Sequence, residues 1–193
     1  MSRRDKGLNF AKRHKVISSD TVREVMTYIA GISVAIVVAL FLVVNFGMKT
    51  VVIGVSMQDT LYNGQTVLIN KLAYLIFKPQ AGDIIVFKPN GNENTHYYVK
   101  RVVAVPGDTV EFRDGTLYVN GIAEEGDTEK VYDAGIAQNP IVLGTDEYFV
   151  LGDNRNNSED SRSGNIGPVS KSLIEGRAWF KFSCRDNYLG FIK

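Results

Sequence analysis

The stretch from Tyr28 to Met48 contains no charge, and only Ser33 and Asn45 interrupt its apolar character. As a helix, these 21 residues span about 31 Å, close to the roughly 30 Å hydrocarbon core of a bilayer. A buried core helix of this length would normally show a polar stripe. A cleavable secretory signal is the other alternative, but its apolar region is usually shorter and a small-x-small site follows it. We therefore predict an uncleaved transmembrane anchor at residues 28–48.

Beyond Met48, period-two alternation and turn signals replace this pattern and predict a β-rich domain at residues 49–193. Its clearest feature is the hairpin "DTVEFRDGTLYVNG" (108–121), in which Asp114-Gly115 suits a two-residue type I′ turn. A short helical turn is predicted at 170–174, and irregular structure at 88–96 and 124–140. The apolar segment 72–77 fits either a core strand or a contact with lipid. Further strands are predicted within segments 50–55, 64–77, 82–88, 96–107, 147–154 and 177–183.

The distribution of charge predicts an orientation for the anchor. Seven basic and three acidic residues precede Tyr28, whereas the formal net charge of the whole chain is only +1. Basic flanks of membrane spans stay in the cytoplasm. We therefore expect residues 1–27 to form a cytoplasmic tail and residues 49–193 to lie outside the plasma membrane. Nothing in the net charge favours nucleic acid as a partner.

Few residues are present that could form a Cys/His zinc site or a disulfide. Cys184 is the one cysteine, which excludes an internal disulfide, and His14 and His96 are the two histidines. These residues do not suffice for a zinc site of the usual Cys/His kind. A Ser-His-Asp triad could use only His96, because His14 lies in the basic tail. We expect neither a metal nor another cofactor.

Lys100 is a candidate general base. Because side chains alternate along a strand, His96, Tyr98, Lys100, Val102 and Ala104 are expected on one face. A lysine among aromatic and aliphatic neighbours is desolvated, which lowers its pKa from about 10.4. A neutral lysine can activate a serine hydroxyl. The alternative is a lysine on an edge strand whose ammonium reaches water.

Two further segments carry candidate chemistry. Ser56 lies in "GVSMQDTL" (54–61), just beyond the apolar run, and could be a nucleophile or an ordinary turn serine. The segment "GDNRNNSEDSR" (152–162) alternates acidic and basic residues, a pattern typical of a rigid, internally bonded loop. A metal site is the competing interpretation of its carboxylates, but the interleaved arginines would neutralise them without a cation.

Four segments together resemble the bacterial type I (leader) signal peptidases with a Ser-Lys dyad, in the form with a single membrane span. They occur in the family's order, and the resemblance extends from the anchor to about Lys181. The segments are "SMQDTL" at Ser56, "AGDIIVF" at Ala81, "YYVKRVVAVPGD" at Tyr97 and "GDNRNNSEDSR" at Gly152. The resemblance implies an antiparallel β-sheet catalytic domain of the signal-peptidase type behind one N-terminal transmembrane helix.

By position, the resemblance implies that Ser56 is the nucleophile and Lys100 the general base. Ser158 matches a serine that hydrogen-bonds the lysine, and Asp160 and Arg162 match a buried ion pair. The family uses the backbone N–H of the nucleophile as one oxyanion donor, so Ser56 should supply it.

Two positions depart from the family's pattern. Some members place a hydroxyl two residues before the nucleophile, where this chain has Gly54. The family usually has a proline three residues after the nucleophile, where this chain has Asp59.

The implied function is the removal of signal peptides from secretory precursors after small-x-small sites at the membrane surface. Residues similar to Val52, Leu61, Tyr98 and Val99 would line pockets that admit only alanine-sized side chains. The implied partners are precursor proteins and membrane lipid, without nucleic acid or metal. The alternative is a specialised or weakly active homologue that serves as an assembly factor for a few surface proteins.

Overall fold

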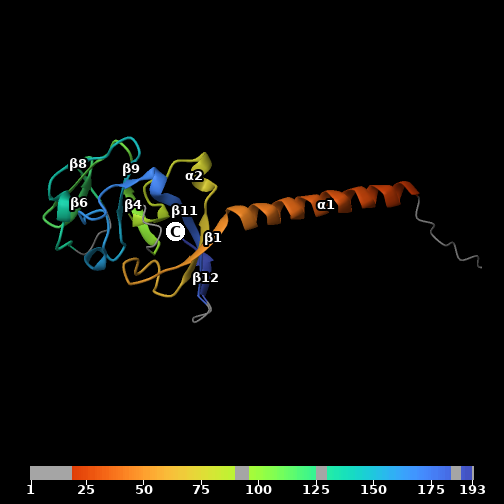
Figure 1. Ribbon diagram of the computed structural model, residues 1–193, viewed down its shortest axis with the longest axis horizontal. Helices are drawn as coiled ribbons and strands as arrows, with labels where there is room; N and C mark the ends of the chain where they lie inside the picture. The colour runs from red at the N-terminus through yellow and green to blue at the C-terminus, as the bar shows by residue number, and fades with distance from the viewer. Residues whose placement is uncertain (1–18, 90–95, 125–129, 184–187, 193) are drawn as a thin grey trace, which may run out of the picture. The chain divides into compact units, whose positions relative to one another are not determined.

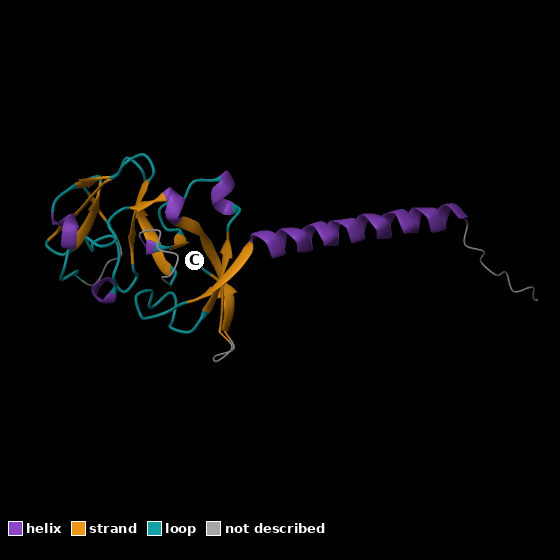
Figure 2. Cartoon of the chain, in the orientation of Figure 1, coloured by secondary structure: helices purple, strands orange, loops and turns teal. Residues whose placement is uncertain are grey.

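The computed structural model describes residues 19–89, 96–124, 130–183 and 188–192, and the chain forms two compact units, 1–43 and 44–193. The first unit contains most of a long helix, and the second consists mainly of strands (Figures 1 and 2). This arrangement confirms the predicted fold class of antiparallel β-structure with one N-terminal apolar helix. Most of the predicted tail lies outside the described residues, as do most of the loop at 88–96 and residues 125–129.

Helix α1 spans Ser19–Phe46, so it begins nine residues before Tyr28 and ends two residues before Met48. Asp20 lies in its first turn, where a carboxylate favourably opposes the positive end of the helix dipole. The residues between Ser19 and Tyr28 carry charge but are compatible with a helix, which is why hydrophobicity alone places the start too late. Residues Ser19–Val43 are long and apolar enough to cross a membrane, and no other described helix is.

The larger sheet contains eight described strands, all paired antiparallel, in the order β1-β2-β11-β3-β4-β9-β10, with β12 paired to β11. The central position of β4 fixes its backbone through hydrogen bonds on both sides, to β3 and to β9. The strands are β1 (Gly47–Val51), β2 (Thr66–Asn70), β3 (Ile84–Phe87), β4 (Tyr98–Ala104), β9 (Glu147–Leu151), β10 (Val169–Ser170), β11 (Ile174–Ser183) and β12 (Tyr188–Phe191).

The smaller sheet has four described strands in the order β7-β6-β5-β8. Its strands are β5 (Thr109–Arg113), β6 (Thr116–Val119), β7 (Ile122–Ala123) and β8 (Ile141–Val142). The β5–β6 hairpin turns at Asp114 and Gly115, which have φ values of 49° and 78°. Two consecutive positive φ values define the type I′ turn, so the predicted hairpin and its turn type are confirmed.

The segment 72–77 forms no core strand; instead, Ala73–Ile76 make the one-turn helix α2. Tyr74 is its buried residue, and its hydroxyl donates to Asp83 Oδ2 at 3.0 Å. Leu75, Ile76 and Phe77 are 72%, 72% and 69% exposed. This exposure excludes the core-strand alternative for the segment.

Short 3₁₀ helices complete the described elements: η2 (Gly135–Gln138), η3 (Arg155–Asn157) and η4 (Lys171–Leu173). Helix η4 corresponds to the helical turn predicted at 170–174.

One hydrophobic cluster of the core lies directly beneath the segment that carries Ser56. It joins Val52, Met57 and Leu61 from that segment to Val67 of β2 and Val99 of β4. Burial of these side chains anchors the turn between β1 and β2 onto the sheet that carries Lys100.

Candidate active site

Ser56 lies in the connection between β1 and β2 (residues 52–65), which we call the nucleophile turn. The ends of the turn are tied by backbone bonds of 2.8 Å from Val52 N to Gln65 O and from Gly64 N to Val52 O. Gly54 N donates to Asn63 Oδ1, and Gly54 has φ of +90°, a conformation that favours glycine. Met57, the residue after Ser56, is buried in the core.

Asp59 lies on the exposed side of this turn. It forms no hydrogen bond with any described residue.

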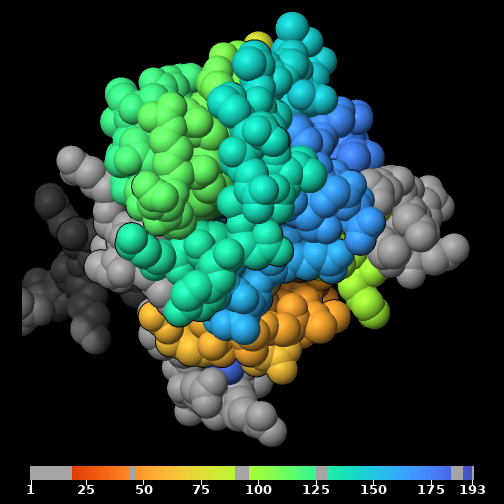
Figure 3. All heavy atoms as spheres, turned by 90° about the vertical axis from the view of Figure 1, so that its left-hand side faces the viewer, coloured from red at the N-terminus to blue at the C-terminus, as the bar shows by residue number. Residues whose placement is uncertain are grey.

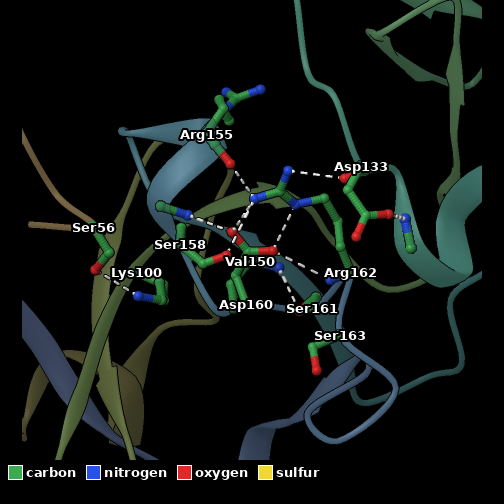
Figure 4. Close-up of polar contacts among 12 residues, drawn as sticks. Ser56, Lys100, Asp133, Val150, Arg155, Ser158, Asp160, Ser161, Arg162 and Ser163 are labelled. Atoms are coloured by element: carbon green, nitrogen blue, oxygen red, sulfur yellow. Dashed lines mark hydrogen bonds and ion pairs between the residues drawn. The ribbon is translucent and has the colours of Figure 1, made fainter.

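Lys100 approaches the serine from the centre of the larger sheet. Its side chain is 4% exposed, and Nζ donates to Ser56 Oγ over 2.7 Å. Figure 4 shows the two side chains pointing toward each other from separate segments. In the backbone, Lys100 pairs with Ile85 of β3, so the direction of its side chain is set by the sheet. The structure therefore brings together the two residues that sequence analysis assigned as nucleophile and base.

The surroundings of Lys100 favour the neutral amine. Burial lowers the pKa of Lys100 from 10.5 to about 8, and the positive charge of Arg162 acts in the same direction. The carboxylates of Asp160, Glu159 and Asp153 oppose this shift but do not cancel it. At mildly alkaline pH a large fraction of the amine is therefore unprotonated and able to accept the proton of Ser56.

The loop 152–162 clamps the backbone around the serine. Asn154 N donates to Ser56 O at 3.0 Å, and Asn154 Nδ2 donates to Val55 O at 3.3 Å. Gly152 lies so close that a Cβ there would come within 2.5 Å of Ser56 O and 2.2 Å of Ser158 Oγ. On the surface in Figure 3, the orange segment that contains this turn lies against the blue segment that contains the loop. These contacts restrain the backbone at Ser56.

A buried ion pair holds this loop in shape. Asp160 is 1% exposed and receives Arg162 Nε on Oδ1 at 2.8 Å and Arg162 Nη2 on Oδ2 at 2.9 Å. The Gly152 N–H also donates to Asp160 Oδ2, at 3.1 Å. Arg162 reaches onward to the carbonyl oxygens of Arg155 and Asp133 (Figure 4). The pair therefore links Gly152, and through it the neighbourhood of Ser56, to the far end of the loop.

Ser158 departs from what the resemblance implies. Its hydroxyl is buried but forms no hydrogen bond with any described residue, and hence none with Lys100. The side chain packs against Gly152, so its oxygen is held by a close steric contact instead of a polar one. The structure places Ser158 within the loop behind the Ser-Lys pair without the predicted bond.

Arg101 has a structural role that the sequence did not reveal. It points away from Lys100 and donates to both oxygens of Asp153, from Nε to Oδ1 at 2.8 Å and from Nη2 to Oδ2 at 2.9 Å. It also donates to Gly82 O at 2.9 Å and to Thr60 Oγ1 at 3.3 Å. Arg101 therefore ties β4 to the nucleophile turn and to the loop 152–162. The sequence shows an acidic residue, Asp153, in "GDN", but no spacing rule predicts that it pairs with Arg101.

A groove of about 440 Å³ runs past the Ser-Lys pair. Of the four predicted lining residues, Val52, Tyr98 and Val99 border it. Leu61 does not; it is fully buried beneath the groove because the turn directs it into the core. The remaining lining residues are Ile53, Gly54, Val55, Ser56, Met57, His96, Tyr97, Lys100, Asn157 and Glu159.

Metal-ligating side chains do not converge in the part of the chain that the structure describes. No group of three or more His, Cys, Asp or Glu side chains is placed there to hold an ion. The loop carboxylates Asp153 and Asp160 are instead paired with Arg101 and Arg162.

Residues 25–183 match the family described as "Signal peptidase, peptidase S26". A "Signal peptidase I" of Bacillus licheniformis is 32% identical over 181 residues, which cover 86% of this chain and 92% of the relative. "Signal peptidase I P" of Bacillus subtilis subsp. natto is 37% identical over 162 residues, covering 79% and 85%. "Signal peptidase IB" of Staphylococcus aureus (strain COL) is 35% identical over 179 residues, covering 83% and 90%.

A solved structure of a signal peptidase I from Enterococcus faecalis V583 shares 34% identity with a TM-score of 0.41, and covers 52% of this chain and 97% of its own. From the match to the family and the extent of identity with its members, the chain belongs to the signal peptidase family, peptidase S26, and is an enzyme, a serine peptidase.

Proposed function

We propose that this enzyme is a membrane-anchored signal peptidase that removes signal peptides from secretory precursors after small-x-small sites. Ser56 is the nucleophile and Lys100 the general base. The observation that carries the proposal is the 2.7 Å contact between Ser56 Oγ and the Nζ of a nearly fully buried lysine. An unassisted serine hydroxyl is a poor nucleophile at neutral pH, and an adjacent neutral amine removes that limitation.

The proton path follows from this geometry. Neutral Lys100 takes the proton of Ser56 as Oγ forms a bond to the scissile carbonyl carbon. The resulting ammonium then protonates the leaving amine, the carbon–nitrogen bond breaks, and an acyl-enzyme remains. Lys100, neutral again, deprotonates a water molecule that attacks the ester. The released signal peptide carries a new carboxylate, and Ser56 recovers its proton.

A backbone N–H is available to stabilise the oxyanion of the tetrahedral intermediate. The N–H of Ser56 donates to no described residue, so it is free to bind an oxygen that develops beside Oγ. Gly54 supplies no hydroxyl to this position, unlike some members of the family. We therefore assign the Ser56 N–H as the one hydrogen-bond donor that residues 54–56 offer to the oxyanion.

The groove supports a preference for small side chains. Apolar residues line it on both sides of the Ser-Lys pair, and the buried Val52, Met57 and Val99 leave little depth beneath the serine. Ile53, on one wall, forms no hydrogen bond with the described residues, so its backbone is free to pair with an extended peptide. An extended chain presents alternate side chains to one wall, as a small-x-small pattern requires.

Anchoring by α1 would place the catalytic unit at the membrane surface, where signal peptides emerge. The uncharged part of α1 is long enough to span the bilayer, and the basic flank before it favours a cytoplasmic N-terminus. The exposed Leu75, Ile76 and Phe77 offer a small apolar surface that suits contact with lipid. The catalytic unit then lies on the outer face of the plasma membrane.

A specialised homologue that acts only as an assembly factor is not favoured. Such a protein would not need the chemistry of the dyad, whereas here both residues are present and in contact.

The decisive experiment is cleavage of a precursor with an Ala-x-Ala site by the full chain in detergent micelles. We expect Ser56→Ala and Lys100→Met each to abolish cleavage while the thermal unfolding temperature stays close to that of the parent. Lys130→Met, at an exposed lysine away from the groove, is the matched control and should cleave normally. Cleavage that survives either dyad substitution would disprove the assignment.

A further inference from the structure

Glu159 lies in the wall of the catalytic groove and has no role in the mechanism derived above. It is held between Ser158, which is packed against Gly152, and Asp160, which is fixed by the buried ion pair. Its own side chain is exposed in the groove. Its carboxylate lies close enough to Lys100 for its charge to act on the amine.

Tyr98 reaches this carboxylate from the opposite wall. It stands two residues before Lys100 on β4, so the two side chains share one face of the strand. The Tyr98 hydroxyl donates to Glu159 Oε2 at 3.0 Å, and Lys100 Nζ lies 5.5 Å from the centre of the Tyr98 ring. The ring and the hydrogen bond thus border the amine on its groove side, while Ser56 contacts it at 2.7 Å.

We propose that Tyr98 and Glu159 are positioning residues for Lys100, and that the hydrogen bond between them holds the amine against Ser56. The proposal rests on the proposed function, since it presupposes Lys100 as the base. Burial and the bond to Glu159 raise the pKa of the Tyr98 hydroxyl, so it stays protonated and remains a donor at working pH. The bridge therefore persists over the range in which the lysine loses its proton.

The bridge also has an electrostatic consequence. The charged groups that act on Lys100 all come from the loop 152–162: Asp160, Glu159, Arg162 and Asp153. Asp160 is neutralised by Arg162 and Asp153 by Arg101. Glu159 forms no ion pair with the described residues, and Tyr98 and Ser56 contribute neutral hydroxyls. The carboxylates of Asp160 and Glu159 both favour the ammonium form of Lys100, and Glu159 is the one of the two without an ion-pair partner among the described residues.

Substitutions can separate the positioning of Lys100 by the Tyr98–Glu159 hydrogen bond from the effect of the Glu159 charge on the lysine. Tyr98→Phe keeps the ring and the charge but removes the hydrogen bond. Glu159→Ala removes both the bond and the charge, and Glu159→Gln removes the charge while leaving an amide oxygen that Tyr98 can still donate to. Glu175→Gln removes a carboxylate that is paired with Lys71 outside the groove, and is the matched control.

The measurement is the pH dependence of kcat and kcat/KM on one Ala-x-Ala peptide without titratable side chains. We expect Tyr98→Phe and Glu159→Ala to lower kcat at the alkaline plateau by about fivefold or more, with a smaller change in KM. Glu159→Gln should move the midpoint of the acidic limb down by about half a unit, and its plateau should exceed that of Glu159→Ala. High salt should shrink this shift, because the carboxylate is exposed. Glu175→Gln should match the parent.

The proposal is overturned if Tyr98→Phe and Glu159→Ala both keep the parental plateau and midpoint. It is also overturned if Glu159→Gln is as impaired at the plateau as Glu159→Ala with no shift of its midpoint. Ser56→Ala and Lys100→Met belong in the same series. If they still cleave, the dyad assignment fails; if they are inactive while Tyr98→Phe and Glu159→Ala behave as the parent, only the bridge fails.

Discussion

At the scale of single residues, the environment of Lys100 decides whether the chemistry is possible. A solvated lysine is almost fully protonated at neutral pH and cannot serve as a base. In this fold the lysine comes from a central strand and is buried, and among the described residues its amine forms its one hydrogen bond with the hydroxyl it would activate. Arg101, the next residue, has the opposite surroundings and is stabilised as a cation by Asp153. The alternation of the strand thus places two neighbouring basic residues in surroundings that shift their pKa values in opposite directions.

Cleavage should therefore rise with pH. Below the lowered pKa of about 8 Lys100 is an ammonium and has no lone pair, whereas above it the amine is neutral and reactive. We expect kcat/KM to increase through a midpoint near that value, well below the ordinary lysine pKa of 10.5. A rate profile between about pH 6 and about pH 10 measures this. Lys100→Arg should be inactive at every pH, because a guanidinium remains protonated; a flat profile for the parent would contradict the mechanism.

Gly152 is the second residue on which the site depends. A Cβ at this position would meet Ser56 O at 2.5 Å and Ser158 Oγ at 2.2 Å, so the loop would have to move away from the nucleophile. We expect Gly152→Ala to lower kcat/KM by tenfold or more, equivalent to about 1.4 kcal/mol of transition-state stabilisation. Gly164→Ala is the matched control, since its nearest neighbour would be 3.8 Å away. Equal activity of the two variants would show that the close packing is dispensable.

At the scale of elements, local pattern predicted much of the β-domain. The alternation of "TVEFR" and "TLYV" around Asp-Gly was sufficient for the β5–β6 hairpin and its turn. The short apolar segment 72–77 was ambiguous because length and hydrophobicity do not distinguish a strand from one turn of helix. Its outcome depends on tertiary contact, namely the bond from buried Tyr74 to Asp83.

The candidate site was predictable in its residues but not in its connections. The motifs identify Ser56 and Lys100, which lie 44 positions apart, and the structure brings them together. They do not reveal that Leu61 turns inward, that Ser158 lacks a polar partner, or that Arg101 binds Asp153. Such details depend on side-chain rotamers and on packing between distant segments, which a single sequence does not encode locally.

The loop 152–162 should owe its shape to the ion pair inside it. Asp160→Ala leaves the buried Arg162 without a counter-charge, and we expect this to cost about 3–5 kcal/mol in the free energy of unfolding. Glu175→Ala breaks the partly exposed pair with Lys71 and should cost no more than about 1 kcal/mol. Urea unfolding of the full chain in micelles, followed by fluorescence of Trp179, the one tryptophan, compares the two variants. Similar midpoints for both would contradict a structural role for the buried pair.

At the scale of the whole molecule, α1 is the described helix that is long and apolar enough to cross a membrane. The uncharged run predicted the existence of the span but not the start of the helix, because α1 continues through the charged residues Arg23 and Glu24. Charged residues are compatible with a helix, so α1 can extend beyond the membrane. The hydrocarbon core excludes charged side chains, so the charged residues mark the limit of the span. We therefore propose the uncharged part of α1 as the span, and the charges beside it predict its orientation.

The basic residues before the span should hold the N-terminus in the cytoplasm. Seven basic residues precede Tyr28, and positive residues close to a span are retained in the cytoplasm. Protease added to spheroplasts should therefore digest the catalytic unit, while an epitope tag at the N-terminus stays protected until the membrane is broken. Replacing the seven basic residues with glutamine should reduce the digested fraction, because it removes the charge bias and leaves the span itself unchanged. Protection of the catalytic unit in the parent would reverse the orientation. It would also separate Ser56 and Lys100 from exported precursors, so the proposed substrate class depends on this result.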